Sequence, residues 1–360
     1  MVRRSTKGVM VGGVMVGGGA RISVQSMTNT DTHDAQATVE QIASLKNAGC
    51  DIVRIAVPDI EAAETVKYIK SRIPEIPLVA DIHFDYRIAL KCAEYGVDKI
   101  RINPGNIGDE ERVRAVCAAC RERNIPIRIG VNGGSLEKHL LEKYGAPTPE
   151  ALFESAEGHI RLLNKFDFDD IVISVKSSDV SSAVAACRYV AERCNYPLHI
   201  GVTEAGSSRM GIIKNAAALG ALISAGIGDT VRISLTEDPA EEVRAAKDIL
   251  RALGCEGHEG MDVVSCPTCG RTKIDLISLT KHFDEAAKSE GLSDIPLKVA
   301  IMGCAVNGPG EAREADVGIA GGVGEAVLIK KGEIVSKIDE GDIVRVLISE
   351  IKKMSENNRK

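Results

Sequence analysis

One stretch that decides the fold is Asp170-Ile171-Val172-Ile173-Ser174-Val175-Lys176. Its apolar residues would occupy both faces of a strand, which is typical of a parallel sheet buried between helices. Seven further runs of this kind each end in polar residues before a segment of helical periodicity: Ile22–Met27, Asp51–Val57, Pro77–Ile82, Asp98–Asn103, Pro126–Val131, Pro197–Val202 and Asp229–Leu235. Eight βα units favour an α/β fold of the (β/α)8 TIM-barrel type. A doubly wound open sheet is the alternative, but no G-x-G-x-x-G turn follows the first strand.

Start and stop signals define the helices between these strands. Asp34 precedes a predicted helix over 35–48, and Asp238-Pro239 opens another that ends before Gly254. The glycine- and valine-rich stretch Gly8–Gly19 is predicted to form a pair of strands rather than a signal peptide. The barrel is therefore expected to occupy residues 1–254.

The pattern changes over residues 255–360, after a Gly/His/Glu-rich linker. The expected elements are a helix, four strands and a final helix: Lys273–Ser289, Leu297–Met302, Asp316–Ala320, Ala326–Ile329, Ile334–Ile338 and Gly341–Met354. This order predicts a small α+β domain built around clustered cysteines.

Composition excludes several classes of function. The chain of 360 residues is 44% apolar, which is enough for two cores, and its net charge of -6 argues against general nucleic-acid binding. Tryptophan is absent and aromatic residues make up 3%, so platforms for stacking single-stranded bases are missing. No run of 18 apolar residues predicts a membrane span. We expect a cytoplasmic protein whose thiols are reduced.

Three of the ten cysteines are clustered. They lie in Ser265-Cys266-Pro267-Thr268-Cys269-Gly270 and in Met302-Gly303-Cys304. A structural zinc site would normally need four Cys or His ligands. Three thiolates with no obvious fourth suggest instead a [4Fe–4S] cluster with one iron that is open or weakly held. Such an iron can contact a substrate, which points to a redox enzyme. The other seven cysteines are expected to be small buried apolar residues: Cys50, Cys92, Cys117, Cys120, Cys187, Cys194 and Cys255.

Basic residues gather at the carboxyl ends of the predicted strands, where functional residues of a barrel lie. These are Arg54, His83, Arg101, Arg128, Lys176 and Arg232. Asp81, Asp51 or Glu204 could pair with single members, but too few carboxylates are available for all of them. An acidic chain with such a mouth is predicted to bind a phosphate or a diphosphate. Glu204 is either a proton donor beside that anion or an ion-pair partner of Arg232 or Lys176.

Six motifs together resemble those of the 4-hydroxy-3-methylbut-2-en-1-yl diphosphate synthase family, the iron–sulfur enzymes of the methylerythritol phosphate route to isoprenoids. They are Val24-Gln25-Ser26-Met27-Thr28-Asn29-Thr30, Asp81-Ile82-His83-Phe84, Arg101-Ile102-Asn103-Pro104-Gly105-Asn106, Ile200-Gly201-Val202-Thr203-Glu204-Ala205-Gly206, Ser265-Cys266-Pro267-Thr268-Cys269-Gly270-Arg271-Thr272 and Met302-Gly303-Cys304-Ala305-Val306-Asn307-Gly308-Pro309-Gly310-Glu311. The resemblance covers nearly the whole chain and corresponds to the compact two-domain bacterial form.

The resemblance implies reductive ring opening and dehydration of 2-C-methyl-D-erythritol 2,4-cyclodiphosphate to a linear allylic diphosphate. It implies that Cys266, Cys269 and Cys304 bind a [4Fe–4S] cluster, with Glu311 as an exchangeable fourth ligand. Thr203 and Glu204 would face the reacting carbons, with Glu204 as proton donor, and Asn307 would reach the substrate from the cluster side. The matching substrate positions are Arg54, His83, Arg101, Asn103, Arg128, Asn132, Lys176, Arg232 and Ser234.

The resemblance further implies a homodimer and an electron donor, either flavodoxin or ferredoxin. One alternative is a barrel lyase or synthase acting on a phosphosugar or pterin, with a structural zinc domain that would recruit His258 or His282. A second is an iron–sulfur scaffold or sensor without catalysis, which leaves the basic strand ends unexplained. Radical-SAM chemistry needs a C-x3-C-x2-C triplet, which the sequence lacks.

Overall fold

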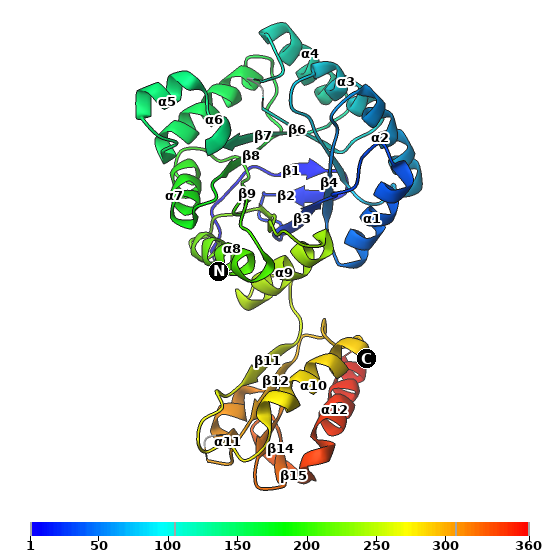
Figure 1. Ribbon diagram of the computed structural model, residues 1–360, viewed down its shortest axis with the longest axis vertical. Coiled ribbons are helices and arrows are strands. Elements are labelled where there is room, and N and C mark those ends of the chain that lie inside the picture. Colours follow the sequence, from blue (N-terminus) through cyan, green and yellow to red (C-terminus); the bar gives the residue numbers. More distant parts are fainter. Residues whose placement is uncertain (1, 104–105, 307, 359–360) are drawn as a thin grey trace. The chain divides into compact units, whose positions relative to one another are not determined.

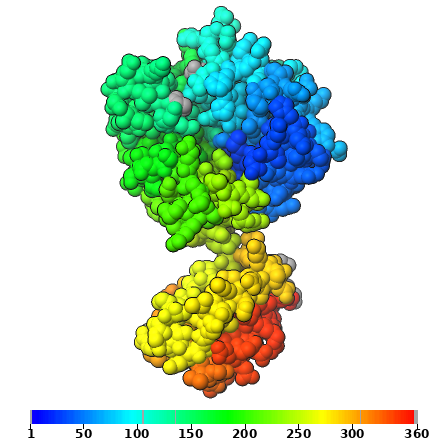
Figure 2. Space-filling model, viewed as in Figure 1, coloured from blue at the N-terminus to red at the C-terminus, as the bar shows by residue number. Residues whose placement is uncertain are grey.

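The computed structural model describes residues 2–103, 106–306 and 308–358. Two compact units make up the chain, Met1–Gly257 and His258–Lys360. In the space-filling view each unit is a packed body in the colours of its own part of the sequence (Figure 2). Each unit also has its own hydrophobic core.

The first unit is a barrel of eight parallel strands. They follow the order β8-β7-β6-β5-β4-β3-β10-β9, and a parallel bridge between Ile173 and Leu198 joins the two ends. Their bounds are β3 Ser23–Met27, β4 Ile52–Ala56, β5 Leu78–Asp81, β6 Lys99–Ile102, β7 Ile127–Asn132, β8 Ile171–Lys176, β9 His199–Ile200 and β10 Thr230–Val231. All eight predicted strands are present, so the barrel is confirmed and the open sheet is excluded.

Helices surround these strands as a ring (Figure 1). They are α1 Ala35–Asn47, α2 Ile60–Arg72, α3 Tyr86–Glu94, α4 Glu110–Glu122, α5 Lys138–Tyr144, α6 Pro149–Asn164, α7 Val180–Ala191, α8 Ser208–Ile223 and α9 Pro239–Ala252. An Asp side chain accepts a backbone N–H at the start of six of them, which satisfies a donor that the helix leaves unpaired. The predicted caps Asp34 and Asp238 are confirmed.

Inward-facing side chains fill the barrel in layers of four, each layer drawn from alternate strands. The strand register gives a lower layer of Ile52, Lys99, Val172 and Thr230. It gives a middle layer of Gln25, Val79, Arg128 and His199. The upper layer consists of Arg54, Arg101, Ser174 and Arg232. The residues between them along each strand pack outward against the helices.

An N-terminal hairpin closes the lower end of the barrel and confirms the predicted strand pair. Strands β1 (Val9–Val11) and β2 (Val14–Val16) pair antiparallel. Valines at 9, 11 and 16 pack against the barrel residues Ile52, Val79 and Val172. In Figure 1 the hairpin crosses the centre of the helical ring. Apolar side chains therefore form the floor of the barrel.

The second unit is a five-stranded sheet with helices packed on it. Its strands are β11 Asp262–Ser265, β12 Lys298–Met302, β13 Val317–Gly321, β14 Glu325–Lys330 and β15 Glu333–Asp339, paired in sequence order. The first three are parallel and the last two antiparallel. Phe283 of α10 (Leu276–Ser289) and Leu347 of α12 (Ile343–Asn358) share one core with the sheet. The α+β prediction is confirmed, although β11 was not among the predicted strands.

Among the described residues, no helix combines the length and the apolar character that crossing a bilayer requires.

Cys117 and Cys120 are buried on α4. Cys194 and Cys255 are only partly buried, so the prediction of burial holds fully for five of the seven unclustered cysteines.

Candidate active site

Five basic residues form what we call the cationic ring: Arg54, Arg101, Arg128, Lys176 and Arg232. All project from inward-facing positions on barrel strands or directly after one. Asp81 at the end of β5 is the inward carboxylate among them, with its side chain 4% exposed. Its Oδ1 lies 3.0 Å from Arg101 Nη1 and its Oδ2 lies 3.4 Å from Arg54 Nη2. One acid therefore pairs with two of the five cations.

The protonation of Asp81 follows from these neighbours. Burial by itself would raise the pKa of this carboxyl, but the charges of Arg54, Arg101 and Arg128 outweigh burial and hold the pKa below its ordinary value. Asp81 is thus a fixed negative charge that orients two guanidinium groups.

Arg232 is oriented from outside the barrel, by helix α9. Glu242 Oε1 lies 3.2 Å from Arg232 Nη2, and Glu242 Oε2 accepts a hydrogen bond of 2.9 Å from Ser26 Oγ. The backbone N–H of Leu235 also donates to Glu242, at 3.1 Å. Glu242 was not among the predicted residues. Glu204 was expected to be either a proton donor or a partner of Arg232 or Lys176, and the described ion pair of Arg232 is with Glu242 instead. Asp51, another partner considered, pairs with Arg21 instead.

Arg128 and Lys176 have no comparable carboxylate. Arg128 is 2% exposed, and its Nε and Nη1 are buried without a hydrogen-bond partner in the described part of the chain. Burial lowers the pKa of Lys176 well below its ordinary value, and the charges of Arg232 and Arg128 lower it further. Buried cations without counter-charges are unfavourable. An anion bound in the mouth would stabilise both.

The remaining predicted substrate residues lie around the upper ends of the strands. His83 Nε2 is 3.0 Å from Arg101 Nη1. Asn103 directly follows β6 and is buried, whereas Asn132 ends β7. Ser234 is half-buried three residues after β10. Of these four residues, His83 has a described contact with the cationic ring.

The segment after β9 has unusual backbone geometry. Gly201 has a φ of 145°, and a Cβ there would lie 2.1 Å from the carbonyl oxygen of Arg232. The Thr203 N–H donates to Ser177 O at 3.2 Å. Glu204 is exposed and has a φ of 51°, a left-handed conformation that is uncommon outside glycine. Such strain concentrates at functional sites, and here it presents the one acid that sequence analysis placed in the mouth.

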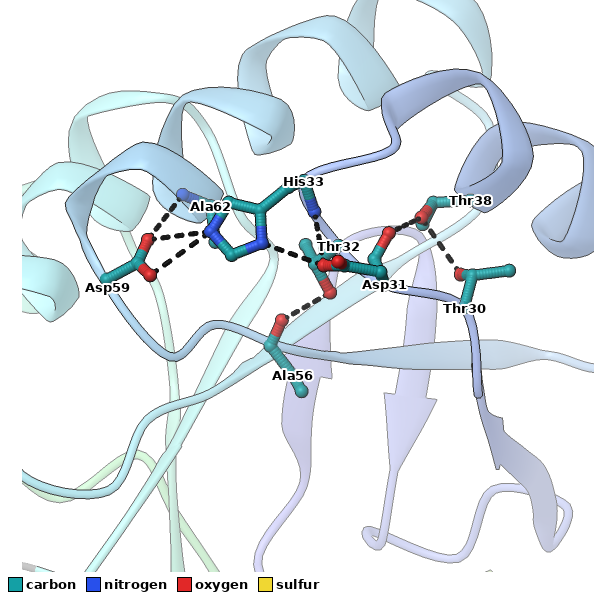
Figure 3. A network of polar contacts seen from close by, with 8 residues as sticks. All are labelled: Thr30, Asp31, Thr32, His33, Thr38, Ala56, Asp59 and Ala62. Atoms are coloured by element: carbon teal, nitrogen blue, oxygen red, sulfur yellow. Dashed lines mark hydrogen bonds and ion pairs between the residues drawn. The ribbon is translucent and has the colours of Figure 1, made fainter.

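Polar contacts fix the loop between β3 and α1 beside the ends of β3 and β4 (Figure 3). His33 Nδ1 lies 2.7 Å from Asp31 Oδ1, and His33 Nε2 lies 3.1 Å from Asp59, the N-cap of α2. Thr32 Oγ1 donates to Ala56 O at 2.6 Å. The pKa of His33 is raised, first by its hydrogen bond with Asp31 and then by Asp59. We call this set of contacts the His33 latch.

In the second unit, the two cysteine motifs follow the carboxyl ends of two neighbouring strands. Because β11 and β12 are parallel neighbours, with Ser265 opposite Ile301, the residues that follow them lie side by side. Cys266 follows β11 and Cys304 follows β12. The N–H of Gly303 donates to Cys266 Sγ at 3.3 Å. Parallel pairing thus connects residues that are far apart in sequence.

Arg271 links the other predicted cluster residues. Its backbone N–H, and then its side chain, donate to Cys269 and hold the pKa of that exposed thiol below its ordinary value. The pKa of Arg271 is itself raised, first by its hydrogen bond with Cys269 and also by the charges of Cys304 and Glu311. Glu311 ends the short helix α11 (Gly308–Glu311). The predicted residue Asn307 lies outside the described residues.

These side chains are of the types that hold an iron–sulfur group, but in the described residues they are not arranged as a complete set of ligands. Over residues 2–103, 106–306 and 308–358, no three His, Cys, Asp or Glu side chains are arranged to hold a metal ion. Yet two of the thiols, Cys269 and Cys304, and the Glu311 carboxylate act on Arg271, and the Gly303 N–H is directed at the sulfur of Cys266. Hydrogen bonds to sulfur are characteristic of such sites. The Thr272 side chain also contributes to the lowered pKa of Cys269.

Comparisons with known proteins agree with this division of the chain. The GcpE TIM-barrel domain matches residues 6–247, and the GcpE protein C-terminal domain matches residues 262–353. The 4-hydroxy-3-methylbut-2-en-1-yl diphosphate synthase (flavodoxin) of Clostridium perfringens is 57% identical, over 97% of this chain and 98% of its own. The protein of the same name from Geobacter sulfurreducens is 56% identical, over 98% and 99%.

A solved structure is similar in fold alone. It is a truncated 3-deoxy-D-arabino-heptulosonate 7-phosphate synthase from Thermotoga maritima, 15% identical with a TM-score of 0.51 over 70% of this chain and 94% of that one. The two domain matches together cover most of the chain, and they extend over both the cationic ring and the cysteine motifs. The chain therefore belongs to the GcpE family.

Proposed function

We propose that this chain catalyses the reductive ring opening and dehydration of 2-C-methyl-D-erythritol 2,4-cyclodiphosphate to (E)-4-hydroxy-3-methylbut-2-enyl diphosphate. The observation that carries the proposal is the cationic ring, in which five buried or half-buried cations meet two carboxylates. A cyclic diphosphate supplies the missing negative charge in a form that arginine binds well. The names of relatives more than half identical to this chain support the same substrate.

The residues of the ring would divide the binding work. Arg128 and Lys176 lack carboxylate partners and would contact the diphosphate directly. Arg54, Arg101 and Arg232 are held in position by Asp81 and Glu242, so their guanidinium groups lose little freedom on binding. His83, Asn103, Asn132 and Ser234 would hydrogen-bond the substrate from the surrounding loops.

In this proposal, the segment after β9 carries out proton transfer. Glu204 would donate the proton that the departing hydroxyl needs to leave as water, and Thr203 would orient the substrate beside it. The left-handed backbone at Glu204 supports this role, because it turns the residue out of the regular strand direction. Asn307 would contact the substrate from the other side.

In the second unit, Cys266, Cys269 and Cys304 would hold one [4Fe–4S] cluster, with Glu311 as a weaker fourth ligand. When bound, the cluster would supply the two electrons of the reduction one at a time. A carboxylate is a hard ligand on a group that prefers sulfur, so Glu311 would be displaceable. Residues 1–254 would then be the substrate domain and residues 255–360 the cluster domain.

The proposal includes partners. The relatives' names specify flavodoxin, and we propose flavodoxin rather than ferredoxin as the donor to this chain. We also propose a homodimer in which the cluster domain of one chain serves the barrel of its partner. A phosphosugar or pterin barrel with a zinc domain is not favoured, because relatives at this level of identity are named synthases of the allylic diphosphate.

The test uses protein purified without oxygen. About four irons and four sulfides per chain, and an EPR signal of the dithionite-reduced protein that changes when the cyclodiphosphate is added, are expected. Cys304→Ser should lose the signal, while Cys194→Ser, which changes a half-buried cysteine of the barrel, should keep it. One zinc per chain and no signal would leave only the anion-binding barrel.

A further inference from the structure

The barrel interior is polar below the cationic ring, where this fold normally places branched apolar residues. The middle and lower layers contain Gln25, His199, Lys99 and Thr230, together with Arg128 of the ring. Each is at most 2% exposed. None except Arg128 has a role in the proposed reaction, so their polarity needs a separate reason.

Most of the polar atoms of these side chains lack partners. Within the described ranges, no hydrogen bond reaches Lys99 Nζ, either ring nitrogen of His199, or either amide atom of Gln25. Arg128 Nε and Nη1 and Thr230 Oγ1 are unpaired as well. Buried polar groups in native proteins nearly always have partners, so a cluster of unpaired ones marks a position that a water or an ion occupies.

The charges that lower the pKa values of His199 and Lys99 indicate that these side chains lie near one another. Burial lowers the pKa of His199 well below its ordinary value, and the charges of Arg128, Lys176 and Lys99 lower it further. Lys99 behaves in the same way, with Arg128 and Arg54 as its charged neighbours. Asp81 and Glu242 are already paired with ring arginines. When protonated, Lys99 would therefore be a like charge close to Arg128, and none of the ion pairs described for the chain includes either side chain.

The hydrogen-bond donors and acceptors of these interior side chains indicate which ligand would bind among them. Lys99, Arg128, the Gln25 amide, the Thr230 hydroxyl and one nitrogen of His199 can all donate, whereas acceptors are few. Water would pair these donors but would not favour the protonated form of Lys99 beside Arg128. A small anion would satisfy the donors and favour protonated Lys99, because its negative charge offsets the repulsion from Arg128. Valines of the N-terminal hairpin pack below the lower layer.

We propose that a monovalent inorganic anion, of which chloride is the representative, binds inside the barrel between Lys99, Gln25 and His199. It shares Arg128 with the diphosphate site above it. The inference rests on the interior side chains and not on the proposed reaction, so either can fail without the other.

Crystals grown in bromide test the site directly. Inorganic diphosphate should be present, so that the cationic ring is occupied and a peak there is not mistaken for the interior site. Data collected at the bromine absorption edge should show an anomalous peak between Lys99 Nζ, the Gln25 amide and the His199 ring. Ordinary waters at that place without anomalous signal would overturn the proposal.

A measurement in solution tests the same site in the full chain. Thermal unfolding is followed in chloride and in gluconate at equal ionic strength, because an anion that binds only the folded state raises the midpoint. The wild-type midpoint should be higher in chloride, and Lys99→Met should abolish the difference. Lys70→Met is the matched control, because Lys70 pairs with Asp98 on the outside of the barrel, and it should keep the difference. Equal wild-type midpoints in the two salts would contradict the proposal even if Lys99→Met failed to fold.

Discussion

At the scale of single residues, the function of this barrel depends on which cations lack a counter-charge. Alternation along the strands predicts that Arg54, Arg101, Arg128, Lys176 and Arg232 face inward, because side chains alternate across a strand. The strand pattern does not predict which carboxylate pairs with each of them. Glu242 belongs to helix α9, which packs against β3, and only the folded chain brings it to Arg232.

The interior residues were missed for a related reason. Lys99 and His199 occupy the first positions of their strands, whereas functional residues of a barrel are expected at the carboxyl ends. Their burial could have been inferred from the two-residue period that links Lys99 to Arg101. Polar residues at such positions are normally taken as solvent-facing, so the signal is easily overlooked.

Arg128→Ala should raise the KM for the cyclodiphosphate about ten- to a hundredfold, since a hydrogen bond to a charged group is worth about 1.5–3 kcal/mol. Steady-state kinetics measures it. Arg121→Ala removes an arginine of α4 that bonds the carbonyl of Phe166 on the outer surface, and it should leave the KM unchanged. An unchanged KM for Arg128→Ala would contradict the binding role of the ring.

Glu311→Ala should retain iron through the three thiols but lose most turnover, because the exchangeable position would lose its protein ligand. Iron analysis and single-turnover kinetics separate the two effects. Glu314→Ala, which changes an exposed acid three residues further along, is the control. Normal turnover of Glu311→Ala would remove the argument for an exchangeable ligand.

At the scale of elements, periodicity predicted the eight barrel strands and the helix starts well, because each signal is local. Strand β11 was missed since its four residues include exposed Asp262 and Ser265 and border a glycine-rich segment. Its place in the sheet comes from pairing with β12, 33 or more residues away along the chain. The convergence of Cys266 and Cys304 depends on that pairing and so could only be hypothesised.

Gly201→Ala should destabilise the barrel, because the new Cβ would lie 2.1 Å from Arg232 O, a backbone atom that cannot rotate away. We expect a loss of about 1–3 kcal/mol in the free energy of unfolding, by analogy with overpacked cores. Gly220→Ala, in the interior of α8 with no neighbour within 4 Å of the new Cβ, should instead stabilise by about 1 kcal/mol. Urea denaturation measures both, and equal effects would argue against the steric reason.

The His33 latch should weaken as the pH rises. His33 has a pKa raised above 6.5, so its contribution to folding is fully present below pH 6.5 and is lost as the pH rises through the raised value. An NMR titration of the imidazole should give a pKa above 6.5 in the wild type. In Asp59→Asn, which preserves the helix cap but removes a charge, the pKa should fall toward 6.5. Identical titrations would show that Asp59 does not contribute.

At the scale of the whole molecule, the proposed reaction needs two units with separate cores. Each unit packs its own apolar residues into a core of its own. The sequence could predict this division, since the βα repeat stops near residue 254. It could not supply the assembly, because pairing between copies leaves no periodic signal in a single chain.

Complementation tests the proposed homodimer. Arg128→Ala has a weakened mouth and Cys304→Ser lacks a working cluster domain. At a substrate concentration well below the raised KM, the first should have little activity alone and the second none. Mixed dimers formed by co-expression should recover part of the activity, because one mouth and one cluster domain remain intact in different subunits. Activity no higher than that of the separate variants would indicate that each chain uses its own cluster. Refolded wild-type mixtures control for losses in assembly.

The valine floor made by the N-terminal hairpin has a consequence for turnover. Because the lower end of the barrel is closed, the reaction product must leave through the same opening by which the next substrate arrives. The two molecules then compete for a single passage, and added product should inhibit competitively against substrate. Cutting back Val9, Val11 and Val16 to alanine should lower the stability of the barrel but leave that competition unchanged, because the side-chain layers above the hairpin still fill the interior.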